Sequence, residues 1–209
     1  MKFKEHILPW FILLGLALLL VIHLSVSLSS EKLESNTLNT TKTQPKDSVQ
    51  IMIEAKAYSS LIKSYDEIEQ FFWYENSHFT HYINRDGISL YIGHHKESSK
   101  PFMRLKISCF TSRFFGMNHI VLYYDGHSMD LPIDYFKDRK FKSEGYGCQE
   151  WIDISIKNNY ITFLEGMAKS NNATIRFKSN TSSRDYKVTE KEKKGIEQVI
   201  LGYNHFFNK

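Results

Sequence analysis

The apolar run at residues 7–28 constrains this chain more than any other feature of its sequence. The run contains no Asp, Glu, Lys or Arg, and as a helix it would be about 33 Å long, enough to cross a hydrocarbon core of about 30 Å. Lys2 and Lys4 precede it, and the positive-inside rule then keeps residues 1–6 in the cytoplasm. The run therefore predicts a single transmembrane signal anchor in the lipid bilayer. Everything after it is expected on the extracytoplasmic side, periplasmic or extracellular.

A cleaved signal peptide is the alternative interpretation of the same segment. Such peptides have an apolar core of about 7–15 residues and a cleavage site between small residues. Ser25, Ser27 and Ser29 provide small residues at a suitable spacing. The strictly apolar part, residues 7–22, is long for a signal and continues beyond His23 to Leu28, so we favour the uncleaved anchor. With cleavage, the protein would instead be secreted or periplasmic.

The rest of the chain divides into a linker and one domain. Residues 29–48 are dominated by Ser, Thr, Asn and Lys, a composition typical of a flexible tether. Residues 49–209 are enough for one domain with a proper core. The net charge of +4 is too small to indicate a nucleic-acid partner. The basic clusters at residues 137–142 and 187–194 are interrupted by acids, so we interpret both as solvated surface.

Short runs with strand character fill the middle of the domain. Met103, Leu105 and Ile107 alternate with polar residues, which predicts a strand with one buried face. Asp125-Gly126 between two such runs is the strongest hairpin signal of the chain. Strands are predicted at residues 71–74, 80–84, 88–93, 103–107, 120–124, 128–131, 150–156 and 173–178.

Three helices are predicted around these strands. The first covers approximately residues 50–64, where helical and alternating patterns overlap, and the second covers residues 160–168. The third begins after Thr189, which with Glu192 matches a capping box. Because hairpins join most strands, we expect an α+β domain whose mainly antiparallel sheet is sandwich-like or strongly curved, with two to three packed helices.

Cys109 and Cys148 are the two cysteines of the chain. In an oxidising compartment they could form a disulfide that closes a loop of about 40 residues, worth about 4 kcal/mol by chain entropy. Two separate buried thiols are the competing interpretation. Neither cysteine has a recognisable base beside it in the sequence, so a catalytic role is not predicted.

The sequence carries no recognised catalytic or metal-binding motif. The six histidines of the strand region, His78, His81, His94, His95, His119 and His127, lack the spacing of a zinc site. No nucleophile elbow and no phosphate-binding glycine loop is present, so neither catalytic residues nor a cofactor are assigned. The acids Asp134, Asp138, Glu150 and Asp153 read as solvent-facing partners of nearby lysines. The aromatic runs at residues 71–74 and 114–115 can supply either core residues or a platform for a glycan or peptide.

The order of several short segments resembles a loose pattern in small bacterial exported or lipoprotein-type domains. These segments include Trp73-Tyr74, residues 90–93, 103–107, 124–126 and 150–154, followed by residues 174–177 and 189–203. The lipid-bearing cysteine of the lipoprotein versions is absent here. The resemblance implies a bacterial cell-envelope protein and assigns no catalytic residues. We therefore expect a single-pass envelope protein that binds another envelope protein or a glycan, with an envelope hydrolase as the alternative.

Overall fold

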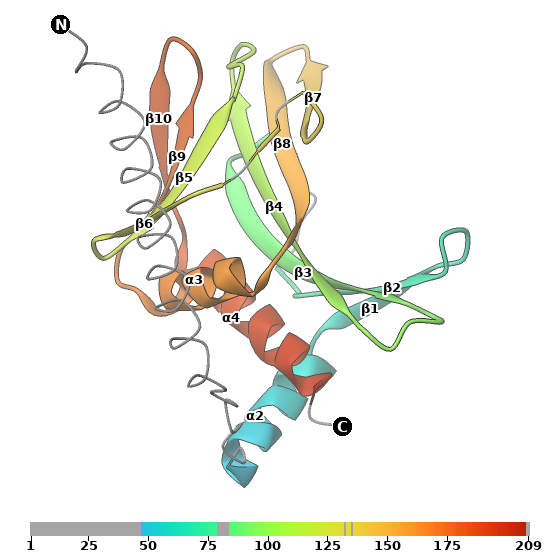
Figure 1. Cartoon of the computed structure of the whole chain (residues 1–209). Helices are drawn as coiled ribbons and strands as arrows, with labels where there is room; N and C mark the ends of the chain where they lie inside the picture. Colours follow the sequence, from blue (N-terminus) through green and yellow to red (C-terminus); the bar gives the residue numbers. More distant parts are fainter. Residues whose placement is uncertain (1–46, 79–83, 132, 135, 208–209) are drawn as a thin grey trace, which may run out of the picture. The chain divides into compact units, whose positions relative to one another are not determined.

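The computed structural model describes residues 47–78, 84–131, 133–134 and 136–207. This part of the chain is α+β, with three helices and two antiparallel sheets, so the expected fold class is confirmed (Figure 1). Residues Lys46–Lys209 form one compact unit. Within the described ranges no helix has the length and apolar content needed to cross a membrane. The expected anchor at residues 7–28 lies outside these ranges.

The strands of the two sheets are interleaved along the sequence. The helices are α2 (Ser48–Ser59), α3 (Asn158–Lys169) and α4 (Glu190–His205). The six-stranded sheet has the order β1-β2-β3-β4-β8-β7, formed by β1 (Ile62–Asp66), β2 (Phe71–Glu75), β3 (Gly87–His95), β4 (Phe102–Thr111), β8 (Gly147–Ile156) and β7 (Arg139–Glu144). The four-stranded sheet has the order β10-β9-β5-β6, formed by β10 (Ser183–Lys187), β9 (Ala173–Lys178), β5 (His119–Tyr124) and β6 (His127–Asp130).

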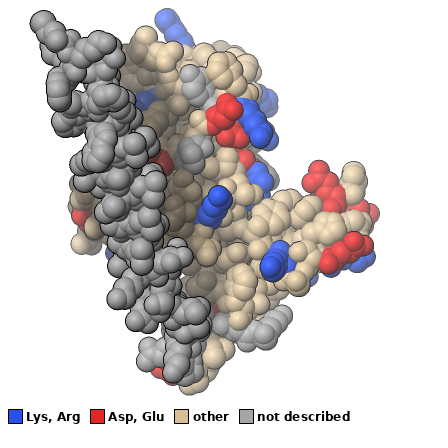
Figure 2. Space-filling view, in the orientation of Figure 1, with Lys and Arg blue, Asp and Glu red and all other residues tan. Residues whose placement is uncertain are grey.

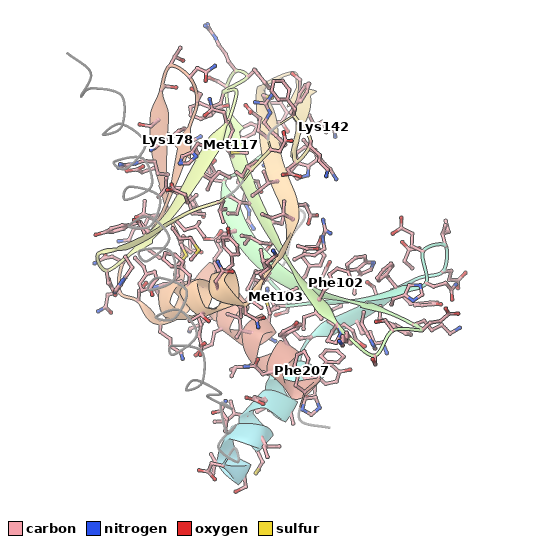
Figure 3. The ribbon with its side chains drawn as sticks, in the orientation of Figure 1. Phe102, Met103, Met117, Lys142, Lys178 and Phe207 are labelled. Carbon is pink, nitrogen blue, oxygen red and sulfur yellow. The ribbon has the colours of Figure 1, made fainter. Side chains whose placement is uncertain are left out.

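One hydrophobic core draws side chains from both sheets and from α3 and α4. On β4, Met103, Leu105 and Ile107 are fully buried, as their alternation predicts. Phe102 lies on the opposite face from Met103, and Figure 3 labels both neighbours. The central strands β3, β4 and β8 of the six-stranded sheet therefore have one face toward the core and one face away from it.

Helix α4 packs on the core as its sequence predicts. Ile196, Val199 and Ile200 are buried, and each contributes about 1.5–3 kcal/mol through burial of its side chain. Gly202 lets α2 and the loop after it pack closely against α4, because an added Cβ at this position would lie 2.7 Å from the Leu61 side chain. The predicted capping box at the start of this helix is also present.

The hairpin predicted at Asp125-Gly126 is confirmed. Both residues have positive φ, 42° and 91°, and they join β5 to β6 with Tyr124 opposite His127. Two consecutive residues with positive φ match the twist that short antiparallel hairpins require, and a glycine adopts this conformation without steric cost.

The first helix is shorter than predicted. It ends at Ser59, and residues 62–64, the last part of the predicted helix, belong instead to strand β1, which pairs with β2. Four of the five β1 side chains are exposed, so neither face carries the apolar alternation that identifies a strand. Strands β7 and β10 were also not predicted, because they too are polar and largely exposed. Most of the strand expected at residues 80–84 lies outside the described residues.

Candidate functional site

The face of the six-stranded sheet that points away from the core gathers aromatic and charged side chains. Cross-strand register pairs Tyr91 with Arg104, Lys106 with Asp153 and Ser108 with Trp151. We call this surface the outer face and define it by Trp73, Tyr91, Phe102, Arg104, Lys106, Lys140, Lys142, Trp151 and Asp153. It is assembled from β2, β3, β4, β8 and β7.

A hydrogen-bonded network lies at the centre of the outer face. The Tyr91 hydroxyl donates to the Asp153 carboxylate at 2.7 Å and accepts from Arg104 Nε at 2.8 Å. Arg104 Nε also bonds Asp153 Oδ1 at 2.9 Å, and its Nη2 donates to the Asp153 carbonyl at 2.7 Å. Burial, followed by the adjacent carboxylate, raises the pKa of Tyr91 far above its ordinary value, so the hydroxyl stays a donor. The three side chains form a fixed polar centre rather than a titrating one.

Aromatic rings adjoin this network. Trp73 stacks on Phe71 with ring centroids 5.3 Å apart, meets Phe102 edge-on at 6.0 Å and lies 5.6 Å from Tyr91. Gly93 makes room for the cluster, because an added Cβ would lie 2.7 Å from the Trp73 ring and closer still to Phe102. Trp73 and Phe102 are partly exposed. Of the run predicted as a platform, Phe71 and Trp73 therefore face outward, whereas Tyr74 is buried in the core.

Lys106 lies between two buried hydroxyls on the outer face. Ser89 is its cross-strand partner and Ser108 is two residues along the same strand. Burial lowers the pKa of Lys106. Among the described residues, Ser89 Oγ and Ser108 Oγ have no hydrogen-bond partner, so neither hydroxyl bonds the lysine. A serine nucleophile needs a base within hydrogen-bond reach, and this arrangement does not supply one.

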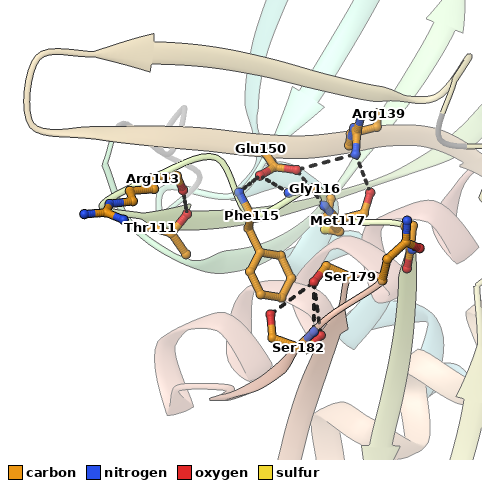
Figure 4. Close-up of polar contacts among 11 residues, drawn as sticks. Thr111, Arg113, Phe115, Gly116, Met117, Arg139, Glu150, Ser179 and Ser182 are labelled. Atoms are coloured by element: carbon orange, nitrogen blue, oxygen red, sulfur yellow. Dashed lines mark hydrogen bonds and ion pairs between the residues drawn. The ribbon is translucent and has the colours of Figure 1, made fainter.

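Glu150 is buried, which corrects the expectation that it faces solvent. Its carboxylate accepts the backbone N–H groups of Phe115, Gly116 and Met117 at 2.6, 2.9 and 2.7 Å (Figure 4). Arg139 lies 3.8 Å from the same carboxylate and donates to the Met117 carbonyl at 3.0 Å. This residue fixes the loop between β4 and β5, so its role is structural. Asp153 also differs from expectation, since it pairs with Arg104 in the outer-face network.

A second polar feature is a cavity of about 550 Å³ where β3 extends beyond the end of β2 and meets the start of α4. Glu192 joins the elements around it. Its Oε1 accepts the N–H of Ile88 at 3.1 Å, and its Oε2 accepts the Tyr186 hydroxyl at 2.9 Å. Its Oε2 also accepts from Thr189 N and Thr189 Oγ1, at 2.8 and 2.7 Å. We call this cavity the α4 pocket.

Cys109 and Cys148 are buried on the neighbouring strands β4 and β8, and the structure holds both as free thiols. Cys109 is opposite Glu150 and Cys148 is opposite Thr111, so the two cysteines are diagonal neighbours. Diagonal Cα atoms lie about 7–8 Å apart, whereas disulfides usually join Cα atoms about 4.4–6.8 Å apart. A bridge would therefore require β4 to shift against β8, and the disulfide stays a prediction.

The described histidines do not gather into a site. His94 and His95 end β3 opposite the start of β2, His78 follows the other end of β2, and His119 and His127 lie on β5 and β6. His119 Nε2 contacts Asp130 Oδ1 at 2.8 Å. Within the described ranges no three His, Cys, Asp or Glu side chains come close enough to hold a metal ion. His81 lies outside these ranges.

The two basic clusters of the sequence lie in different parts of the fold. Residues 137–142 include the start of β7, and residues 187–194 span the end of β10 and the start of α4. In Figure 2 most Lys and Arg side chains stand apart from one another, and several have Asp or Glu beside them. The described residues visible in this view form no continuous basic surface of the kind that nucleic-acid binding uses.

No protein-family model matches this sequence, and the search of curated proteins finds no significant relative.

Proposed function

We propose that residues 49–209 form a binding module of the cell envelope, anchored in the membrane by residues 7–28, and that its outer face binds an anionic glycan. The observation that carries this proposal is the placement of aromatic rings between cations on one face of one sheet. Trp73, Phe102 and Trp151 are partly exposed there. The flat rings can stack on the apolar faces of sugar rings, while polar groups between them fix orientation.

The charge of the outer face supports an anionic ligand. Asp153 is paired with Arg104 at 2.9 Å, which neutralises both groups. Lys140 and Lys142 on β7 are exposed. Their cross-strand neighbours on β8 are Trp151 and Gln149, respectively, so each pair lies on the same face of the sheet. Lys106 is the cross-strand partner of Asp153, and its charge is offset by Glu75 on the same face, so Lys140 and Lys142 carry the excess charge. These lysines give the face an excess of positive charge beside its rings, which favours carboxylated or phosphorylated sugars over neutral ones.

Binding to two polymers of matched length tests the proposal on the full-length chain in detergent micelles. We expect a polyuronate to bind and a neutral dextran not to bind, with affinity falling as salt is added. Lys140→Gln combined with Lys142→Gln should weaken binding about tenfold, or about 1.4 kcal/mol, without affecting the fold. Lys187→Gln, an exposed lysine of the other sheet, is the matched control.

Three results would contradict the glycan assignment. Equal binding of both polymers would remove the role of charge, and binding of neither would remove the glycan. Selective binding of poly-glutamate would reassign the outer face to an acidic protein partner. The double lysine variant is exposed and outside the core, so a loss of binding in it cannot be attributed to unfolding.

The membrane anchor at residues 7–28 is a separate part of the proposal and has its own test. The intact mass of the protein recovered from membranes distinguishes an uncleaved anchor from a cleaved signal peptide. A mass that includes residues 1–28 supports the anchor. Loss of these residues would make the module a diffusible protein, with its binding face unchanged.

A further inference from the structure

We propose that helix α2 lies on the membrane surface and inserts its exposed apolar side chains among the lipid headgroups. This inference rests on the proposed anchor at residues 7–28, which brings the domain to a bilayer, and it does not depend on the proposed glycan. Three observations support it: the reversed polarity of α2, its place in the chain and its place in the fold.

The polarity of α2 is the reverse of that of an ordinary surface helix. Val49, Met52 and Ile53 recur at helical spacing on one side of the helix, and they are 58%, 72% and 45% exposed. The inward side includes Gln50 and Glu54, and Glu54 is 1% exposed and accepts a hydrogen bond from Gln50 at 3.0 Å. A surface helix normally turns its apolar residues toward the core and its polar residues toward water. The outward apolar residues of α2 are therefore placed to contact an apolar environment outside the domain.

The charge of this side of α2 suits a lipid surface. Lys56 follows Ile53 on the same side and is exposed, whereas Glu54, the one acid within the helix, is buried. We call Val49, Met52, Ile53 and Lys56 together the α2 face. Helices that lie in a membrane interface combine apolar residues with basic ones, which are attracted to anionic headgroups. With 12 residues, α2 is about 18 Å long and too short to cross a hydrocarbon core, so it fits the interface and not the interior.

The order of the chain brings α2 to the bilayer. Residues 29–46 separate the apolar run from Asp47, the residue that caps α2. With the composition of a tether, a chain of this length spans about 20–25 Å on average and at most about 65 Å when fully extended. Of the helices and strands of the domain, α2 is the one attached nearest to the anchor along the sequence. Its start is therefore held close to the membrane.

The position of α2 in the fold leaves the α2 face accessible. The helix packs mainly against α4, and its first half extends beyond the rest of the described domain, whereas the hairpin of β9 and β10 forms the opposite end (Figure 1). A second copy of the chain fits this face less well than lipid does. A stable protein interface uses about 20–30 residues from each partner, far more than the α2 face offers.

The experiment measures lipid contact at single positions of the full-length chain in vesicles of phosphatidylcholine and phosphatidylglycerol. Met52→Cys carries a fluorophore on the α2 face, and Thr181→Cys carries it on the exposed turn between β9 and β10. The chain without an added cysteine measures any labelling of the buried Cys109 and Cys148, which is subtracted. Nitroxide-labelled lipids should quench position 52 at least about threefold more than position 181, because an interfacial helix inserts its apolar side about 5–10 Å into the lipid boundary. Equal quenching at both positions would overturn the proposal.

A double variant assigns the lipid contact to the α2 face. Val49→Gln combined with Ile53→Gln should reduce quenching at position 52 to the level at position 181. Glutamine is at least as good a helix former as valine or isoleucine, so the helix is retained. Ile68→Gln, at a 94% exposed position in the turn between β1 and β2, is the control and should leave quenching unchanged. Undiminished quenching in the double variant would overturn the assignment.

Two further outcomes separate this inference from its alternatives. Energy transfer between donor-labelled and acceptor-labelled chains at position 52, without quenching by lipid, would reassign the α2 face to a second copy and overturn the proposal. A chain that fails to float with the vesicles would contradict the anchor at residues 7–28 and this inference with it. A chain that floats but shows equal quenching at both positions would contradict the α2 contact alone.

Discussion

Replacing Glu150 by Gln tests the account of the loop between β4 and β5. The substitution keeps the shape of the side chain and removes its charge. The native carboxylate is 1% exposed and accepts three backbone N–H groups from consecutive residues. A glutamine has one acceptor oxygen, which can retain the bonds from Phe115 and Gly116. Its NH₂ group would then face the N–H of Met117 and the guanidinium of Arg139, both of which are also donors.

The expected destabilisation follows from this count. Losing one charge-assisted hydrogen bond costs about 1.5–3 kcal/mol. The two retained bonds lose their charge assistance and about half of their strength, which adds about 1–2 kcal/mol. We therefore expect Glu150→Gln to lower the free energy of unfolding by about 2.5–5 kcal/mol, close to the cost of about 3–5 kcal/mol for removing one partner of a buried ion pair.

Urea denaturation of the full-length chain measures this change. Glu165→Gln is the control, because Glu165 forms an exposed pair with Lys169 worth about 0.3–0.5 kcal/mol. Trypsin cleavage after the exposed Arg113 gives a local readout, since a released loop should be cut faster. A loss of stability no greater than that of the control, with unchanged cleavage, would refute the proposed role of Glu150.

Three further predictions concern other parts of the domain. Thr189→Ala should lower stability by about 0.5–2 kcal/mol through loss of the helix cap, and an unchanged urea midpoint would count against it. Gly93→Ala should lower the free energy of unfolding by about 1–3 kcal/mol, because its Cβ would overlap the Phe102 ring. Gly145→Ala is the control and should be neutral, because no atom lies within 4 Å of the added Cβ. Equal effects of the two substitutions would reject the packing argument. Burial raises the pKa of Cys109 to about 12 from 9.0, so above pH 9 the unfolded chain loses this proton while the folded chain keeps it. Between about pH 9 and 12, the free energy of unfolding of the native protein should therefore fall by about 1.4 kcal/mol per pH unit more than that of Cys109→Ala. Urea denaturation of both proteins across this pH range measures the difference, and equal pH dependence in the two would disprove the prediction.

The sequence predicts elements whose signals are local. The capping box of Thr189 and Glu192 satisfies amides within one helical turn, and the Asp125-Gly126 hairpin depends on two backbone conformations. Both are present as predicted. The alternation at residues 103–107 is also confirmed, because one side of β4 is in the core.

The sequence does not predict elements whose identity depends on a distant partner. Strand β1 has no apolar alternation, and only its pairing with β2 identifies it as a strand. Glu150 resembles any acid beside lysines until the fold brings residues 115–117 to it. The outer-face network similarly unites Tyr91, Arg104 and Asp153 from three strands. Spacing along the chain contains no sign of such groupings.

The interleaved sheet order has a consequence for how this chain acquires its structure. Strand β4 pairs with β8, and all of β5 and β6 lie between them in the sequence. Strand β5 in turn pairs with β9, which follows β8 and α3. The six-stranded sheet is therefore complete only when β8 is present, and the four-stranded sheet only when β10, near the end of the domain, is present. We therefore expect slow, all-or-none folding of a high contact-order chain, with no shorter fragment able to fold by itself.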